Sequence, residues 1–352
     1  VPGEVRIGLT AYSNVDDLVG EATFEDDTFV LNWGNQLLGV SAEKSFTGNP
    51  ALLGLTFGDS AVLSQRVSHS RFRLKMDLWE QALTLNNPVS DTRASGALTF
   101  FNNRHDRSVG YELSSQSYRY DANFPAVIYP SDSVINANRT ASVFFDDLWR
   151  PSHRWLIQAG ARYDHYQRLG GVLQPRLSVK YFLTPDLAVT GAYGEFAQSA
   201  HSLAREDVPI RALVFWAGSD DRAPVSRARH FIAGVERWYG GLRALRVEGF
   251  FKQYPRLIEQ NPYSAANVQG DEFIRLRGYS YGGDVMLRQL SNGRFAGWAA
   301  YNFAFSSRTN TFGQRFFPGH DRRHELNLVG SWTGRRWTKS VRFNLATGTP
   351  YT

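Results

Sequence analysis

The chain has 352 residues, no cysteine, an aromatic content of 14%, a formal net charge of +6 and a mean hydropathy of −0.36. Without cysteine, this chain can hold no disulfide, no thiolate metal site and no cysteine nucleophile. No apolar run approaches the roughly 18 residues that a transmembrane helix needs, and the basic residues alternate with acidic ones instead of clustering as a nucleic-acid surface requires.

The dominant pattern is a strict alternation of apolar and polar residues, which is typical of strands with one apolar and one wet face. Residues 155–166 show it well, with Ile157 and Tyr163 on one face and Arg162 and Asp164 on the other. The predicted strands, in chain order, are residues 5–12, 29–46, 51–65, 92–103, 107–120, 141–149, 155–166, 173–183, 187–198, 228–239, 242–254, 279–290, 295–307, 323–332 and 337–347.

Residues 66–91 fit this pattern least well. Residues 71–79 could form a strand or part of a long loop, and residues 77–85 could form a short helix. A single additional membrane strand here would reverse the direction of every earlier strand. We therefore expect an extracellular excursion.

From residue 141 onward, short and long connections mostly alternate. Tight turns at 184–186, 240–241, 291–293 and 333–336 interleave with long segments such as 199–226 and 308–321. Outer-membrane barrels have short periplasmic turns and longer extracellular loops, whereas sandwiches and propellers give no reason for such alternation. The fold class predicted is therefore all-β, an antiparallel up-and-down transmembrane β-barrel. A soluble protein with a hydrated charged face also produces alternating strands, so the loop lengths carry the distinction.

The first residues of the chain lack a charged segment followed by an apolar one, so they do not read as a signal peptide. If the protein is exported, we expect its true N-terminus to lie elsewhere and this chain to be a fragment.

Several short motifs, in this order, resemble the barrel of TonB-dependent outer-membrane receptors. They are Trp33-Gly34-Asn35, Gln174-Pro175-Arg176-Leu177, Ala192-Tyr193-Gly194, Gly234-Val235-Glu236, Gly282-Gly283-Asp284, Ala300-Tyr301, Asp321-Arg322-Arg323-His324 and the ending 346–352. Each motif alone is short, and their order and spacing carry the resemblance over residues 33–352.

The resemblance implies a barrel of about 22 strands with an N-terminal plug. Residues 1–352 would be a single barrel domain, incomplete at both ends, with four strands missing before it and three after it. It also implies a bacterial outer-membrane location and active uptake of a scarce, bulky nutrient such as an iron chelate, a cobalamin-like compound or a glycan. The implied partners are outer-membrane lipid, the plug of the same full-length protein, the TonB complex and the nutrient. We expect no nucleic-acid partner, no cofactor and no enzymatic activity. The alternatives are a passive porin-like channel and a soluble all-β binding protein.

The charged faces of the predicted strands would line the lumen and form ladders of opposite sign across neighbouring strands. The predicted lumen-lining residues are Arg162, Asp164, Arg176, Lys180, Arg246, Glu248, Asp284, Arg288, Arg323, Glu325 and Arg342. In the long loop 199–226, Arg211, Phe215 and Trp216 are candidate substrate-binding residues, because exposed aromatic side chains among charges can mark a binding surface. An aromatic pair that only packs the loop is the alternative interpretation.

Two further patterns suggest chemistry but lack its context. Ser280 sits in a G-x-S-x-G match, but the residues after it alternate as a strand instead of forming the helix that a nucleophile elbow needs. His320 and His324 have a spacing that would suggest a metal site on a helix. At a loop-to-strand junction, an interfacial anchor is the simpler interpretation, and we predict no metal site.

Overall fold

The structure is a computed structural model that describes residues 4–22, 27–48, 51–52, 55–56, 58–78, 83–123, 132–203, 215–260, 273–291 and 293–350. Within these residues there is no helix long and apolar enough to cross a membrane. The described strands are β1 (Val5–Ala22), β2 (Asp27–Thr47), β3 (Ala51–Leu52), β4 (Leu55–Thr56), β5 (Ser60–Leu78), β6 (Leu83–Phe101), β7 (His105–Asn123), β8 (Asp132–Ser152), β9 (Trp155–Tyr166), β10 (Gly170–Thr184), β11 (Leu187–Gln198), β12 (Ala200–Leu203), β13 (Phe215–Gly218), β14 (Ser226–Tyr239), β15 (Arg243–Gln260), β16 (Phe273–Gln289), β17 (Phe295–Thr309), β18 (Arg315–Phe316), β19 (His324–Thr333) and β20 (Thr338–Ala346).

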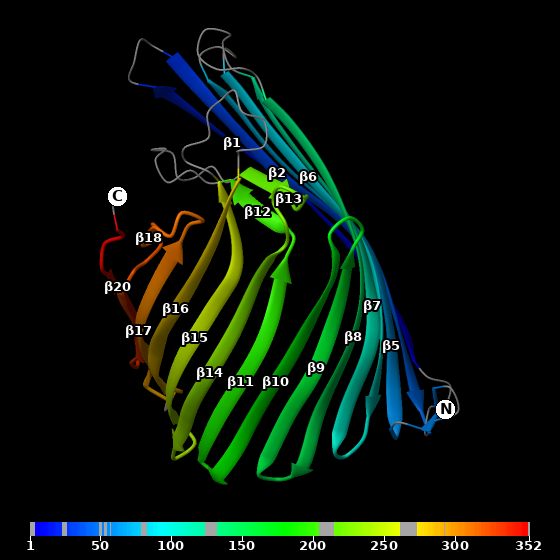
Figure 1. Cartoon of the computed structure of the whole chain (residues 1–352). Helices are drawn as coiled ribbons and strands as arrows, with labels where there is room; N and C mark the ends of the chain where they lie inside the picture. The colour runs from blue at the N-terminus through cyan, green and yellow to red at the C-terminus, as the bar shows by residue number, and fades with distance from the viewer. Residues whose placement is uncertain are drawn as a thin grey trace.

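A single antiparallel sheet of 16 strands dominates the fold. Its path follows the chain from β1 to β20, with β18 attached to β17 and with the small hairpins β3–β4 and β12–β13 outside it. The sheet curls into a wide trough, with the two termini at opposite edges and opposite ends (Figure 1). β1 and β20 do not pair with each other in the described part of the chain. The predicted up-and-down antiparallel architecture is confirmed.

The connections at the two ends of the sheet differ in length, as predicted. At the turn end, residues 153–154, 185–186 and 240–242 suffice to reverse the chain. Gly240 and Gly241 have φ angles of 56° and 69°, a left-handed conformation that glycine adopts without steric cost. At the loop end, residues 199–225 and 310–323 separate consecutive long strands and carry β12, β13 and β18.

The prediction for residues 51–91 was wrong in detail. Residues 51–52 pair with residues 55–56 outside the main sheet, and the membrane strand begins at Ser60 instead of at residue 51. In the segment 66–91, which we expected to be an extracellular excursion, residues 66–78 continue β5 and residues 83–91 begin β6. These two strands pair without interruption from Ser60↔Phe101 to Leu78↔Leu83. Both strands are 19 residues long. This extension of β5 and β6 adds no further membrane strand, so the predicted directions of the strands hold.

The convex, outer face of the sheet is apolar over a broad band. One row crosses nine consecutive strands, and every neighbouring pair in it is directly opposite: Trp155, Tyr181, Val189, Val235, Val247, Val285, Tyr301, Leu326 and Leu345. A second row nearer the loop end carries Tyr193, Phe231, Phe251, Tyr281 and Phe305. Such a band bordered by aromatic rings is the expected lipid-facing surface of a membrane barrel.

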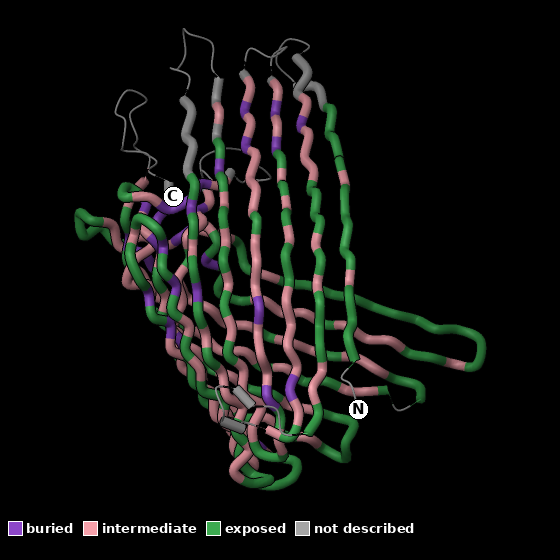
Figure 2. Tube along the Cα trace, turned by 90° about the vertical axis from the view of Figure 1, so that its right-hand side faces the viewer, coloured by how far each residue is buried: buried purple, intermediate pink, exposed green. Residues whose placement is uncertain are grey.

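At the loop end of β2 and β5–β7, this orientation reverses. Leu74 and Met76 on β5 and Leu85 on β6 are 5–8% exposed and lie on the inner face, while Lys75 and Asn86 occupy the outer face opposite each other. Figure 2 shows the buried residues concentrated toward the loop end. Here the strands form a small core inside the sheet, as in a soluble protein, above the apolar outer band.

Candidate functional site

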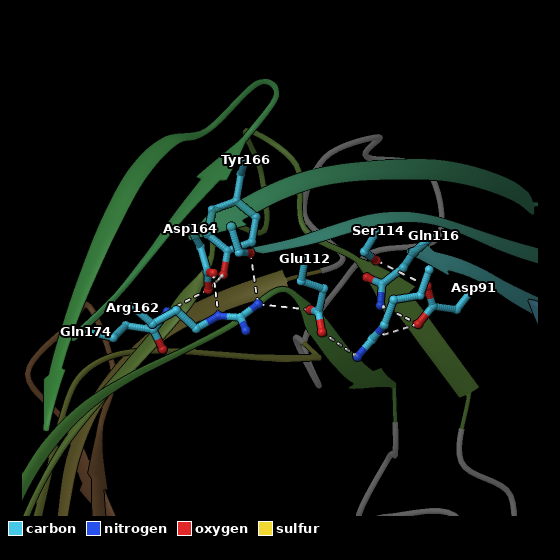
Figure 3. Close-up of polar contacts among 10 residues, drawn as sticks. Asp91, Glu112, Ser114, Gln116, Arg162, Asp164, Tyr166 and Gln174 are labelled. Carbon is cyan, nitrogen blue, oxygen red and sulfur yellow. Dashed lines mark hydrogen bonds and ion pairs between the residues drawn. The ribbon is translucent and has the colours of Figure 1, made fainter. Parts of the chain in front are cut away.

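Polar contacts run along the inner face from β6 to β10 (Figure 3). Arg162 on β9 occupies the centre of this network. Its guanidinium donates hydrogen bonds to Asp164 at 2.6 Å, to Glu112 on β7 at 2.9 Å and to the Ser142 hydroxyl on β8 at 2.8 Å. Asp164 is only 5% exposed, and a buried carboxylate is costly unless it is paired and hydrogen-bonded. Arg162 therefore connects three neighbouring strands and neutralises a buried charge.

The network continues toward β11 through two further donors. Asp164 accepts hydrogen bonds from Gln174 Nε2 at 2.5 Å and from the Tyr166 hydroxyl at 3.3 Å. Gln174 Oε1 in turn accepts from the backbone amide of Ala197 at 3.0 Å. Backbone pairing of β10 with β11 stops at Arg176↔Gly194, so this side chain links the two strands beyond the end of their ladder.

In the other direction, the network reaches β6. Arg93 lies 3.4 Å from Glu112 and 2.7 Å from Asp91, and Asp91 accepts a hydrogen bond from Ser114 at 3.1 Å. The opposite charges therefore alternate from β6 to β9.

Lys180, Glu236 and Arg246 extend the charged wall over β10, β14 and β15. Lys180 lies 3.3 Å from Glu236, and Glu236 is directly opposite Arg246. These contacts agree with the expected ladder of opposite charges.

The ladder prediction was wrong farther along the sheet. Glu248 on β15 and Asp284 on β16 are directly opposite each other, although both are acidic. Each instead finds a partner elsewhere, because Arg246 lies 2.6 Å from Glu248 on its own strand and the Asn302 amide donates to Asp284. Residues two apart share a strand face, so an ion pair along one strand competes with pairing across strands.

The remaining predicted lumen residues are less connected. The Arg176 guanidinium lies 5.0 Å from the centre of the Phe196 ring. Arg323 lies 3.4 Å from Asp321, and Glu325 accepts from the Asn327 amide at 2.9 Å. Two further arginines form no ion pair within the described residues and lie opposite apolar residues of the neighbouring strand: Arg288 opposite Trp298, and Arg342 opposite Val329.

In the described part of the segment between β11 and β14, the strand pair β12–β13 lies inside the trough against the inner face (Figure 1). Asn87 on β6 fixes this hairpin. Its amide donates to the backbone oxygens of Arg119 at 2.7 Å and of Trp216 at 3.1 Å, and accepts from the Trp216 backbone amide at 2.8 Å. Asn87 has no exposed surface, so these three bonds replace all its contacts with water.

Asn138 on β8 provides a second attachment by donating to the Ser199 backbone oxygen at 3.1 Å. Gly218 on β13 lies so close to Tyr118 and Asn138 that a Cβ atom there would come within 2.7 Å of each. A glycine is therefore required for the close approach of the hairpin to the wall.

The candidate substrate residues of this loop have different outcomes. Arg211 and the side chain of Phe215 lie outside the described residues, and Trp216 is held through its backbone. Sequence reasoning missed Asn87 because it falls in the segment expected to be a loop. The available signal was an asparagine on one strand face between two apolar residues, with Leu85 and Val89 two positions before and after Asn87.

His201 on β12 is 3% exposed, and its Nε2 lies 2.8 Å from the Ser219 hydroxyl. Burial lowers the pKa of His201 from 6.5 to about 4, because a charged imidazole loses its hydration there. The hairpin therefore carries a neutral histidine at physiological pH.

A cavity of about 460 Å³ lies at the loop end between β8, the β9–β10 turn and residues 219–222. Its charged lining residues are Arg139, Arg168, Arg222, Asp220 and Asp221. Asp220 pairs with Arg222 at 3.2 Å. The lining therefore has a small positive excess.

The G-x-S-x-G match around Ser280 and the histidine of the predicted strand start, His324, make ordinary structural contacts. Ser280 lies within β16, which continues to Gln289, and its hydroxyl is 2.7 Å from that of Ser306. His324 Nδ1 is 2.7 Å from the Tyr301 hydroxyl, and its ring lies 5.3 Å from that of Phe303. Among the described residues, no group of three or more His, Asp or Glu side chains is arranged to hold a metal ion.

Comparisons with known proteins agree with this geometry. A family model described as "TonB dependent receptor-like, beta-barrel" matches residues 4–352. No curated protein matches the sequence. Among solved structures, the chain is similar to the alcaligin outer membrane receptor FauA from Bordetella pertussis, with a TM-score of 0.60, 13% identity, and coverage of 98% of this chain and 63% of FauA.

Two further structures show the same fold. The siderophore receptor PirA from Pseudomonas aeruginosa has a TM-score of 0.54 and 12% identity, with 98% of this chain and 72% of PirA covered. The ferric citrate transporter FecA has a TM-score of 0.58 and 13% identity, with 96% of this chain and 58% of FecA covered. The chain thus spans less than two thirds of the length of FauA and FecA.

Proposed function

The chain belongs to the TonB-dependent receptor-like β-barrel family of the bacterial outer membrane, and we propose that it forms the wall of a receptor that imports an anionic ferric chelate with energy delivered through TonB. The assignment of residues 1–352 to a single barrel domain is part of this proposal. The observation that carries it is the strand pair β12–β13 inside the trough, fixed to the inner wall by Asn87.

The inner wall supports this function through its charges. A closed apolar core would need no network like that of Arg162, Glu112 and Asp164, whereas a water-filled lumen or a polar plug does. The proposed partners are the plug of the full-length protein, which would pack against this wall, and the TonB complex acting on that plug.

Two observations support a ferric chelate over a cobalamin-like compound or a glycan. The structurally similar proteins are a receptor for alcaligin, FauA, a siderophore receptor, PirA, and a ferric citrate transporter, FecA. The loop-end cavity has more arginine than aspartate in its lining, which favours an anionic ligand.

The test uses cells that lack the gene for the full-length protein and that carry it again on a plasmid. We expect the plasmid to restore uptake of a radiolabelled ferric chelate, and loss of TonB to abolish that uptake. Uptake that persists without TonB would identify a passive channel. Restored uptake of cobalamin or of a glycan, without uptake of any ferric chelate, would overturn the substrate assignment.

A single substitution tests the cavity. Arg168→Gln removes a cation from its lining, and we expect the affinity for the ferric chelate to fall about tenfold. Arg154→Gln, in the turn at the opposite end of β9, is the matched control and should leave the affinity unchanged. If both variants bind the ferric chelate with the same affinity, the chelate binds outside this cavity.

A further inference from the structure

The outer face carries a shallow apolar groove of about 430 Å³ at the loop end of β6–β9. One row of residues forms its floor: Ala94, Leu113, Ala141 and His165, each directly opposite the next. In the next row, Tyr111, Val143 and Tyr163 occupy β7–β9, and β6 carries Gly96. The groove therefore lies where the small side chains of Ala94 and Ala141 alternate with the larger ones of Leu113 and His165.

The groove lies where the outer face changes from apolar to polar. Along β7 the outward residues pass from Leu113 to Ser115, and along β8 from Ala141 to Arg139. Ser115 and Arg139 are directly opposite each other, so the two strands change at the same level. In a membrane barrel, this border lies near the lipid headgroups.

Arg139 borders the groove at its polar end. It is exposed, and its guanidinium has no carboxylate or hydrogen-bond partner within the described residues. Its backbone oxygen accepts from the Gln167 amide at 3.0 Å, which fixes the chain at this point. An arginine held at the headgroup level with free donors matches a phosphate group.

We propose that this groove binds one phosphate-bearing membrane lipid, with an acyl chain over Ala94, Leu113 and Ala141 and the phosphate at Arg139. Apolar burial alone adds little selectivity, because the surrounding lipid tails are as apolar as the groove. The shape of the groove holds the acyl chain of the lipid, and Arg139 selects for a negatively charged headgroup. Arg139 also lines the loop-end cavity, so the lipid site borders that cavity, whereas the apolar part of the groove lies on the outer face of the sheet.

The experiment measures lipid binding to the delipidated full-length protein in detergent by native mass spectrometry. The probes are phosphatidylglycerol and phosphatidylcholine with identical acyl chains. We expect the wild type to retain one phosphatidylglycerol about fivefold more strongly than phosphatidylcholine, which corresponds to one arginine–headgroup contact. Arg139→Gln should remove this preference.

Arg168→Gln is the matched control, because Arg168 is a nearby cation that does not line the groove. It should keep the full preference for phosphatidylglycerol. A preference that survives Arg139→Gln, or one that both variants lose equally, would overturn the proposal.

Filling the groove gives an independent result. Ala141→Phe should weaken retention of both lipids, whereas Ala161→Phe, at an outward position outside the groove, should not. A thermal unfolding curve of each variant checks folding. Unchanged lipid retention in a folded Ala141→Phe variant would contradict the proposal, and if that variant does not fold, the Arg139→Gln result alone decides.

Discussion

The later strands β9–β11 and the earlier strands β5–β8 differ in length and in the orientation of their faces. β9 and β11 have 12 residues each, and β10 has 15, so they scarcely exceed a membrane span. β5–β8 have 19–21 residues, and beyond the apolar band they carry Leu74, Met76 and Leu85 on the inner face. Strand pairing and lipid contact are therefore separate properties, since a strand can continue after its apolar face has changed side.

The largest expected effect comes from a charge on the apolar outer face. Val247 is 42% exposed and lies in the middle of the outward apolar run of β15. Val247→Arg should lower the free energy of unfolding by about 2–4 kcal/mol, because it places a cation in lipid. Urea unfolding in lipid vesicles measures this change.

Ser117→Arg is the control, because Ser117 is an outward residue of β7 beyond the apolar band. We expect it to change the stability by less than about 0.5 kcal/mol. If Val247→Arg and Ser117→Arg lower the free energy of unfolding equally, the two positions do not differ in their contact with lipid.

Breaking the attachment of the hairpin should have the next largest effect. Asn87→Ala leaves the Trp216 backbone groups without partners, which costs about 1–3 kcal/mol locally. Hydrogen exchange at the Trp216 amide should accelerate by about tenfold or more. Asn86→Ala changes the neighbouring outward residue and should leave this exchange rate unchanged. Slow exchange in the Asn87 variant would mean that other contacts hold β13.

The pH dependence of the hairpin follows from His201. Its pKa is about 4 in the folded chain and about 6.5 when exposed, so only the open state binds a proton between these values. The hairpin is therefore most stable above pH 6.5 and loses stability as the pH falls toward about 4. Hydrogen exchange in β12 and β13 should accelerate over this range in the wild type. His201→Gln should flatten the profile, and an unchanged profile in that variant would exclude His201 as the cause.

The smallest effect concerns the inner-wall network. Arg162→Gln removes three hydrogen bonds and the charge partner of Asp164, and we expect a loss of about 1–2 kcal/mol. Arg342 lies on the same face and has no ion-pair partner within the described residues, so Arg342→Gln should leave the stability almost unchanged. Thermal unfolding in detergent compares the two variants. Similar unfolding temperatures would show that the network adds no stability.

The sequence predicted the membrane part of the fold well, because the alternation of apolar and polar residues directly indicates which face of a strand contacts lipid. Residues 155–166 and 187–198 were predicted with the bounds that β9 and β11 have. The sequence did not decide between strand and loop at residues 66–91, because the outward residues Arg71, Arg73 and Lys75 are as polar as those of a loop although the strand continues. Inward contacts across β5–β7 and β13 hold this region, and they join residues far apart in the chain.

The site was less predictable for a related reason. The inward charges Arg162 and Asp164 could be assigned to one face, because alternation fixes the face of every residue in a strand. Their partners could not be assigned, because neighbours along a strand compete with neighbours across strands, as Glu248 and Asp284 show. The attachment of β13 by Asn87 depends on the path of a long loop, which local pattern does not encode.

The most direct test of the account is the lipid exposure of β7, residue by residue. The chain has no cysteine, so single cysteines from position 109 to position 119 can carry a fluorophore that brominated lipids quench. We expect strong quenching at positions 109, 111 and 113, weak quenching at the even positions between them, and none at 117 and 119. Quenching that continues through 117 and 119, or that favours the even positions, would contradict the change of faces on which the account rests.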